Sequence, residues 1–167
     1  IVLAALRDKM LGLAASQVQG AHPYLVTPEH TVRARKVMGS DAWLCPEQMV
    51  MLETDASTAR TAARAALNIY IGLPNYQNNL KQFGFTDADF AGGGSGRLVD
   101  SLVAWGDEQS IAKRVREHHD AGADYDKAAK LMSLGYPGGP EIERRARHGD
   151  RAAYPLPRPL LNEDTNK

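Results

Sequence analysis

Short apolar runs alternate with segments of helical spacing along the first part of the chain. Residues 1–6 form a continuous apolar run, as expected for a strand buried on both faces, and residues 10–18 carry apolar side chains at helical spacing. A second apolar run covers residues 21–26. It is followed by Thr27 as an N-cap, Pro28 at the first helical position and the acidic Glu29 in the first turn, which together predict a helix to about Met38. The pattern therefore predicts two successive strand–helix units.

A third strand–helix unit is predicted between residues 42 and 70. We expect its strand within residues 42–53, where Pro46 interrupts the hydrogen-bonding ladder, and Asp55 then caps an alanine-rich helix that reaches about Tyr70. Three alternations predict parallel strands joined by right-handed crossovers. The predicted fold is therefore α/β, a partial (β/α)8 TIM-barrel segment with about three parallel strands and many helices.

The region at residues 73–105 departs from this alternation. It is irregular and helical, it contains a glycine-rich loop at residues 91–96, and its last apolar residues recur at helical spacing up to Val103. We interpret it as an insertion rather than as a fourth strand–helix unit. Gly106-Asp107-Glu108 then opens a further helix, whose apolar face extends to His118 or His119.

The pattern changes again near Gly122. A helical segment ends at Gly135, and Pro137-Gly-Gly-Pro140 excludes helix for several residues before a last helix begins. We therefore divide the chain into residues 1–122, the barrel segment, and residues 123–167, an α-helical tail rich in proline and glycine.

Composition narrows the class of protein. The chain has 167 residues, of which 43% are hydrophobic and 24% charged, as is normal for a soluble globular protein. Twenty basic and twenty acidic residues balance, so we expect neither a nucleic acid nor a membrane as partner. Cys45, the single cysteine, fits a small buried apolar residue better than a nucleophile and is compatible with a reducing cytoplasm.

Histidines and the glycine-rich loop are candidate chemical groups. His22 follows a predicted strand and can donate a hydrogen bond, act as an acid near neutral pH, or serve a structural role. His118 and His119 are adjacent, so they cannot form the i, i+4 pair of a helical metal site, and we expect no metal. Gly92-Gly-Gly-Ser-Gly-Arg97 is similar to a phosphate-cradling loop but lacks the Walker lysine, which favours the alternative of a mobile loop over the barrel mouth.

Several phrases in the first 120 residues together resemble luciferase-like, deazaflavin-dependent oxidoreductases. They are Val2-Leu-Ala-Ala-Leu6, Gly20-Ala-His-Pro-Tyr24, Thr27-Pro-Glu-His30, Pro46-Glu-Gln48, Gly72-Leu-Pro-Asn-Tyr76 and Leu102-Val-Ala-Trp-Gly-Asp107. The resemblance implies a (β/α)8 barrel, of which this chain holds the fifth to seventh strands. It also implies hydride transfer between a small-molecule substrate and coenzyme F-420, or alternatively FMN, in the mouth of the barrel.

The same resemblance implies a cofactor site at the carboxyl ends of the strands. The backbone of Ala5 and Leu6 would approach the cofactor phosphate, and His22 and Pro23 would face the same mouth. Arg7 stands where many relatives keep a glycine and adds a cationic contact. The alternative for Ala5 is packing within the barrel. No catalytic residue is assigned.

The tail resembles a different enzyme, the tRNA adenosine threonylcarbamoyltransferase. The matching phrases are Tyr125-Asp126-Lys127, Gly135-Tyr-Pro-Gly-Gly-Pro-Glu-Ile142, Gly149-Asp150 and Pro155-Leu-Pro-Arg-Pro159. The resemblance implies that Asp126, Gly139 and Glu143 contact the nucleotide part of the threonylcarbamoyl-adenylate, a carboxylate suiting ribose hydroxyls and a glycine allowing close backbone approach. Alternatively, the Pro-Gly-Gly-Pro sequence only ends one helix and begins another. That family's paired metal-binding histidines have no counterpart in this chain.

Three functional hypotheses follow. The leading one is a cytoplasmic fragment of a deazaflavin- or flavin-dependent oxidoreductase with impaired or lost hydride transfer. The first alternative is a fragment of a tRNA threonylcarbamoyladenosine-forming transferase that keeps a nucleotide contact. The second alternative is a non-catalytic module that self-associates through exposed sheet edges.

Overall fold

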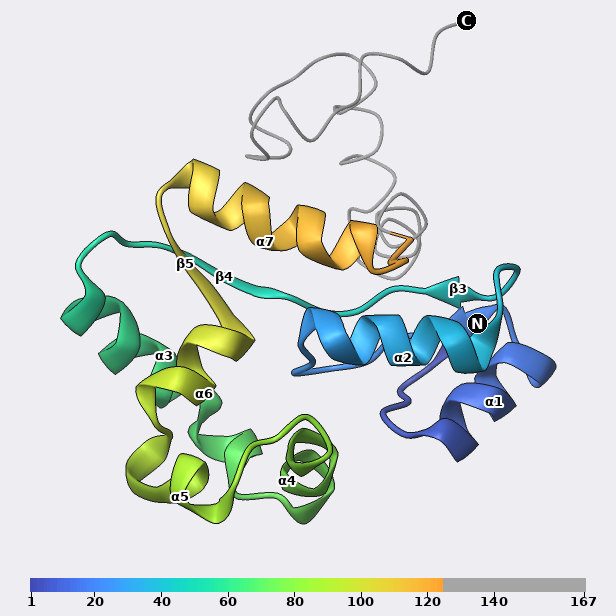
Figure 1. Cartoon of the computed structure of the whole chain (residues 1–167), viewed down its shortest axis with the longest axis horizontal. Helices are drawn as coiled ribbons and strands as arrows, with labels where there is room; N and C mark the ends of the chain where they lie inside the picture. Colours follow the sequence, from blue (N-terminus) through green and yellow to red (C-terminus); the bar gives the residue numbers. More distant parts are fainter. Residues whose placement is uncertain (125–167) are drawn as a thin grey trace, which may run out of the picture. The chain divides into compact units, whose positions relative to one another are not determined.

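A computed structural model describes residues 1–124 (Figure 1). The chain divides into two units after Ala123, and the description concerns the first. This unit is mixed α/β, and all of its strand pairs are parallel. The strands are β1 (Val2–Leu3), β2 (Gly20–Ala21), β3 (Trp43–Leu44), β4 (Met49–Leu52) and β5 (Val103–Gly106). The helices are α1 (Asp8–Gln17), α2 (Pro28–Met38), α3 (Ala56–Ile71), α4 (Pro74–Lys81), α5 (Asp87–Phe90), the 3-10 helix η1 (Ala91–Gly93), α6 (Gly96–Leu102) and α7 (Glu108–Asp120).

The first sheet has the strand order β1-β2-β3, so its strands are neighbours in the order of the sequence. Gly20 in the middle strand, β2, lies opposite Trp43 in β3. A Cβ atom at position 20 would overlap the carbonyl group of Trp43. Only glycine allows the two strands to approach so closely. The predicted α/β alternation with parallel strands is confirmed for this sheet.

The second sheet consists of β4 and β5, paired in parallel from Met49 opposite Val103 to Leu52 opposite Gly106. β3 and β4 lie along one extended segment (Figure 1), within the range expected for the third strand. Pro46 stands between them, as its missing N–H predicts. The segment therefore joins the two sheets.

One feature of the predicted fold is wrong. Val103 does not continue the apolar helical face, because α6 ends at Leu102 and residues 103–106 form β5, which together with α7 makes a further strand–helix unit. The described strands form two small sheets, and that they are part of a barrel stays a prediction. β1 and β2 are also shorter than the strands expected at residues 1–6 and 21–26, and in the second of these runs Pro23 has no N–H and Leu25 has a positive φ.

Polar caps start the helices where the sequence predicts. The Asp55 side chain accepts a hydrogen bond from the Thr58 N–H at the start of α3, and Asp107 accepts one from the Ser110 N–H at the start of α7. Thr27 occupies the N-cap position of α2 in an extended conformation, before the proline of the first turn. Each capping bond satisfies an N–H that the helix itself leaves unpaired.

Two apolar cores hold these elements. One lies between α1, α2 and the first sheet and includes Ala5, Leu11, Ala14, Ala21, Ala34 and Leu44. The other joins α3, α4 and α6 to β5 and includes Leu25, Leu67, Ile71, Leu80, Leu98 and Val99. Both consist of fully buried side chains, which supply the main favourable contribution to folding.

One face of β4 is uncovered. Met49 and Met51 pack against the second core, whereas Val50 and Leu52 are 54% and 70% exposed. Successive side chains of a strand point to opposite faces, so the two exposed residues lie on the same side. Self-association through this face stays a prediction.

Arg35 fastens the end of the described unit. Its Nε and Nη2 donate to the Gly122 carbonyl at 3.0 and 2.7 Å, and its Nη1 donates to the carbonyls of Gly39 and Ala42. Gly122 has a φ of 99°, in the region that favours glycine. One guanidinium therefore joins α2, the loop after it and the turn after α7.

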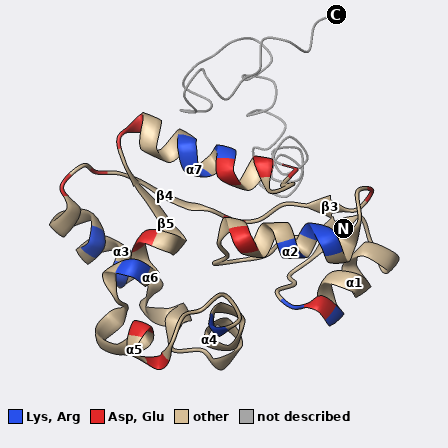
Figure 2. Cartoon of the chain, viewed as in Figure 1, with Lys and Arg blue, Asp and Glu red and all other residues tan. Residues whose placement is uncertain are grey.

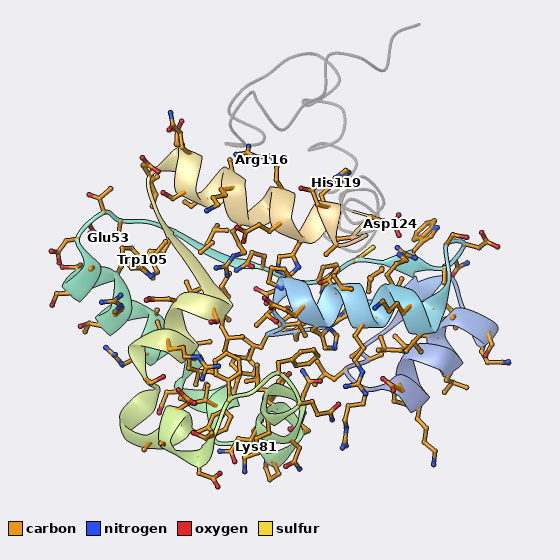
Figure 3. All side chains as sticks on the ribbon, in the orientation of Figure 1. Glu53, Lys81, Trp105, Arg116, His119 and Asp124 are labelled. Carbon is orange, nitrogen blue, oxygen red and sulfur yellow. The ribbon has the colours of Figure 1, made fainter. Side chains whose placement is uncertain are left out.

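His118 joins α7 to both sheets. The Gln48 amide nitrogen donates its two hydrogens to the carbonyls of Met49 and Leu102. The amide oxygen Oε1 can only accept, so the His118 Nε2–H donates to it at 3.1 Å. The unprotonated Nδ1 of the neutral ring then accepts from the Thr31 hydroxyl at 2.8 Å. His118 is fully buried and His119 is exposed on the same helix (Figure 3), which confirms that they face different directions.

Charges of both signs occur along α7, whereas α3 carries only basic and α5 only acidic residues (Figure 2). In residues 1–124, moreover, none of the helices combines the length and the apolar character that crossing a membrane requires.

Lowering the pH should destabilise the folded chain through His118. Burial, followed by the nearby Arg114 and His30, lowers the pKa of His118 from 6.5 to about 4, and Glu29 opposes the shift. Between these values the unfolded chain binds a proton that the folded chain does not, so the free energy of unfolding falls as the pH falls from about 6.5 to about 4. At ~1.4 kcal/mol per pH unit, the total loss is on the order of 3 kcal/mol. Urea unfolding at several pH values in this window measures it.

Two variants isolate this contribution. His118→Gln should reduce the dependence on pH, because glutamine does not titrate. His119→Gln changes the exposed neighbour and should keep the dependence of the parent chain. Equal slopes in the parent and in His118→Gln would show that another group is responsible.

Candidate functional site at the carboxyl ends of the strands

The first three strands run parallel, so the segments that follow them meet at one edge of the sheet. These segments begin at Ala4, His22 and Cys45. The ladder between β2 and β3 continues into them, since the Cys45 N–H donates to Ala21 and the Glu47 N–H donates to Pro23, at 2.9 and 2.8 Å. Ligands of parallel sheets bind outside the carboxyl ends of the strands. This edge is the candidate site.

The residues expected near a cofactor phosphate have mixed environments. The Ala5 side chain is 3% exposed and lies in the core under α1, which agrees with the packing alternative. The Leu6 carbonyl lies 2.7 Å from His30 Nε2. Arg7 is exposed and occupies the N-cap position of α1. A backbone contact of these residues with a phosphate stays a prediction.

His22 is held by the neighbouring strand. Its N–H donates to the Leu3 carbonyl, and its ring Nδ1 lies 2.5 Å from the Cys45 carbonyl oxygen. A carbonyl only accepts, so Nδ1 carries the proton, and Nε2 of the neutral ring is an acceptor. The hydrogen-bonded structural role is present, while the second nitrogen keeps its capacity to bind.

Glu47 is the residue that sequence reasoning missed. Its carboxylate accepts a hydrogen bond from the Leu25 N–H, but its Oε2 is buried and has no hydrogen-bond partner. Burial raises the pKa of the Glu47 carboxyl, and the Leu25 N–H and His22 oppose the shift. An unpaired buried polar atom typically costs about 1–3 kcal/mol of stability. The signal available in the sequence was a carboxyl side chain directly after Pro46, the residue that interrupts the predicted strand.

Leu25 adopts a strained backbone conformation beside Glu47. Its φ is 52°, the one positive φ of a non-glycine residue among residues 1–124. The left-handed region costs an L-residue with a Cβ roughly 1–2 kcal/mol. Leu25 is also fully buried in the second core, so the strain is held by packing. Strain of this kind gathers at functional sites, where it orients a group.

Two aromatic pairs belong to the segments near these strand ends. His22 and Tyr24 form an edge-to-face pair with ring centroids 5.2 Å apart, and Tyr70 and Tyr76 form another at 5.6 Å. Burial raises the pKa of Tyr76, and Tyr70, Tyr24 and Glu47 add to the shift in that order. Tyr76, which belongs to α4, therefore lies close to both strand ends.

The glycine-rich loop uses its polar groups internally. The Ser95 hydroxyl donates to Asp89 and accepts from the Leu98 N–H, and so caps α6. The Gly94 carbonyl accepts from Arg64, and the Gly94 N–H donates to Ala91. These bonds account for the loop without a phosphate. Its expected mobility stays a prediction.

A shallow cavity of about 300 Å³ is lined by residues of β5 and α7, among them Trp105. Figure 3 labels Trp105 on β5. Its charged lining is already paired, because Arg114 donates to Glu117 and to two backbone carbonyls, and Asp100 accepts from Arg60 and from the Trp105 ring. We assign no ligand to it.

In the described part of the chain, histidine, cysteine and carboxylate side chains form no group of three that could hold a metal ion. Cys45 is buried, as its apolar character predicts. Asp126, Gly139 and Glu143, the candidate nucleotide contacts, lie outside the described residues.

Comparison with known proteins finds similarity over a short segment. No protein-family model and no solved structure matches the chain. The tRNA N6-adenosine threonylcarbamoyltransferase of Methylibium petroleiphilum is 62% identical over 45 residues, which cover 27% of this chain and 13% of that protein. The protein of the same name from Sphingopyxis alaskensis is 52% identical over 56 residues, 34% of this chain and 16% of that protein. That of Bordetella pertussis is 60% identical over 42 residues, 25% of this chain and 12% of that protein.

A segment of this chain is thus similar to these transferases, but it spans less than a fifth of their length. The comparisons give no support to the luciferase-like resemblance of the first 120 residues. They favour the transferase alternative over the oxidoreductase hypothesis.

Proposed function

We propose that the tail of this chain is a nucleotide-contacting segment related to a tRNA threonylcarbamoyladenosine-forming transferase. The observation that carries this proposal is the 62% identity over 45 residues, a length close to that of the phrases quoted between Tyr125 and Pro159. Chance similarity at that identity does not extend over ordered motifs of this kind.

The chemistry of three residues fits a nucleotide. The Asp126 carboxylate can accept from ribose hydroxyls, Gly139 lets the backbone approach a phosphate closely, and Glu143 adds a second acceptor. We propose nucleotide binding for this segment, which covers 13% of the relative's length. The names of the relatives contain tRNA, which makes adenosine the chemical group to test, against the initial expectation of no nucleic-acid partner.

A second candidate function is the binding of a deazaflavin or flavin by the first 120 residues. The parallel order β1-β2-β3, with polar and aromatic side chains at the carboxyl ends, favours it. Such a cofactor supplies hydride transfer when bound. Arg7 would contact its phosphate at the N-terminus of α1, where the acidic Asp8 is already paired with Arg33.

Replacing Asp126 tests the first proposal. Asp126→Ala should weaken binding of an adenylate by the full chain about tenfold, the effect of losing ~1.4 kcal/mol of hydrogen bonding, as measured by isothermal titration calorimetry. Asp120→Ala removes an exposed carboxylate from α7 and should leave the affinity unchanged. Equal affinity of the Asp126→Ala chain and the parent would contradict the assignment.

Replacing Arg7 tests the second candidate. Arg7→Ala should weaken binding of coenzyme F-420 or FMN about tenfold, since one charged contact with the phosphate is lost. Binding of riboflavin, which has no phosphate, should not change. Lys9→Ala, an exposed cation two residues away on α1, is the control. A parent chain that binds neither cofactor would eliminate this candidate.

A further inference from the structure

α7 is fastened to the rest of the described unit by hydrogen bonds more than by apolar packing. Neither apolar core of residues 1–124 includes a side chain of this helix, whose fully buried residues are Ala112 and His118. The helix meets α2 where the Thr31 hydroxyl bonds the His118 ring and where Arg35 donates to the Gly122 carbonyl, just beyond the helix end. An element with few buried apolar contacts opens at a lower free energy than one inside a core.

The other end of α7 offers a hinge. Gly106 lies directly before the N-cap Asp107 and has a φ of 130°, in the left-handed region that favours glycine. Arg114 donates to the carbonyls of Asp100 and Ser101 on α6, which leads into β5. These bonds tie α7 to the second sheet and do not join it to α2. Motion about Gly106 therefore separates the helix from α2 without a change in either core.

The bonds of the His118 ring depend on its neutral form. Nδ1 accepts from the Thr31 hydroxyl, and the Nε2–H donates to Gln48. Protonation turns Nδ1 into a second donor, so the Thr31 hydroxyl has to rotate and accept. Its own hydrogen then faces the Thr27 carbonyl at 3.5 Å, the length of a weak bond. The charged ring thus loses a good contact with α2 while it stays buried.

The groups around the ring also favour its neutral form. Burial is the largest cause that lowers the pKa of His118 from 6.5 to about 4, followed by Arg114 on the same helix and His30 on α2, while Glu29 on α2 opposes the shift. Thr31 and Gln48, which bond the ring, carry no charge. A ring that leaves its buried position regains access to water, so protonation stabilises the state in which α7 is detached.

We propose that α7 is a pH-sensitive switch, in which protonation of the His118 ring releases the helix from α2 while both apolar cores stay folded. The released helix has 13 residues, a length that is marginal without tertiary contacts, so it also loses its own hydrogen bonds. The inference does not depend on a ligand at the strand ends or in the tail.

Amide hydrogen exchange of the full chain, followed by mass spectrometry, tests this proposal. The exchange of each peptide is divided by that of the same peptide in the unfolded chain at the same pH, which removes the intrinsic effect of pH. Between pH 7.5 and pH 5 the protection of α7 should fall roughly thirtyfold, as follows from a ring with a pKa of 6.5 when open and about 4 when closed. The protection of α1 and α3, whose side chains belong to the two cores, should change much less.

Two outcomes of this measurement overturn the proposal. One is a protection of α7 that is the same at both pH values. The other is an equal loss of protection in α7, α1 and α3, because the cores would then unfold together with the helix. Cys45 gives a second readout of the cores, since its buried thiol should stay unreactive toward dithiodipyridine at both pH values.

Two variants assign the effect to one ring. His118→Gln cannot titrate, so the pH dependence of α7 protection should disappear, while protection of α1 and α3 shows that the chain is folded. His119→Gln changes the exposed neighbour and should keep the dependence of the parent. A dependence that persists in His118→Gln belongs to His30 or Glu29 and overturns the proposal. If His118→Gln does not fold, the measurement on the parent chain still decides. No ligand is involved, so failure here is distinguishable from failure of either proposed function.

Discussion

The hydrogen bonds of the His118 ring determine how the described part of the chain fits together. The ring lies between the Thr31 hydroxyl on α2 and the Gln48 amide at the junction of β3 and β4. Gln48 in turn binds the Leu102 carbonyl, directly before β5. One neutral, buried side chain therefore connects both sheets, and each bond in this series orients the next.

The candidate site inherits its geometry from this connection. Glu47 immediately precedes Gln48 in the segment between β3 and β4. The bonds of Gln48 therefore restrain the backbone next to Glu47. Leu25 completes the restraint from the second core, where its side chain is fully buried. A rigid core thus carries the strain, and the carboxyl group gains a defined orientation.

Features that depend on neighbouring residues in the sequence could be predicted, whereas features that depend on tertiary packing could not. The caps at Asp55 and Asp107 depend on a few neighbouring residues, and both were predicted. β5 was missed because Leu98, Val99, Leu102 and Val103 also suit one helical face, and only pairing with β4 makes Val103 extended. The positive φ of Leu25 opposes the ordinary preference of leucine and is imposed by tertiary packing. Glu47 was passed over as a candidate site residue because its environment comes from α4 and two strands far apart in the sequence.

The uncovered face of β4 has a consequence for how chaperones and proteases treat this chain in a cell. Val50 and Leu52 present apolar surface beside the main chain of a short strand pair. Molecular chaperones retain chains that display such surface, and proteases remove those that display it for long. A chain that displays Val50 and Leu52 in this way offers apolar surface of the kind that chaperones bind.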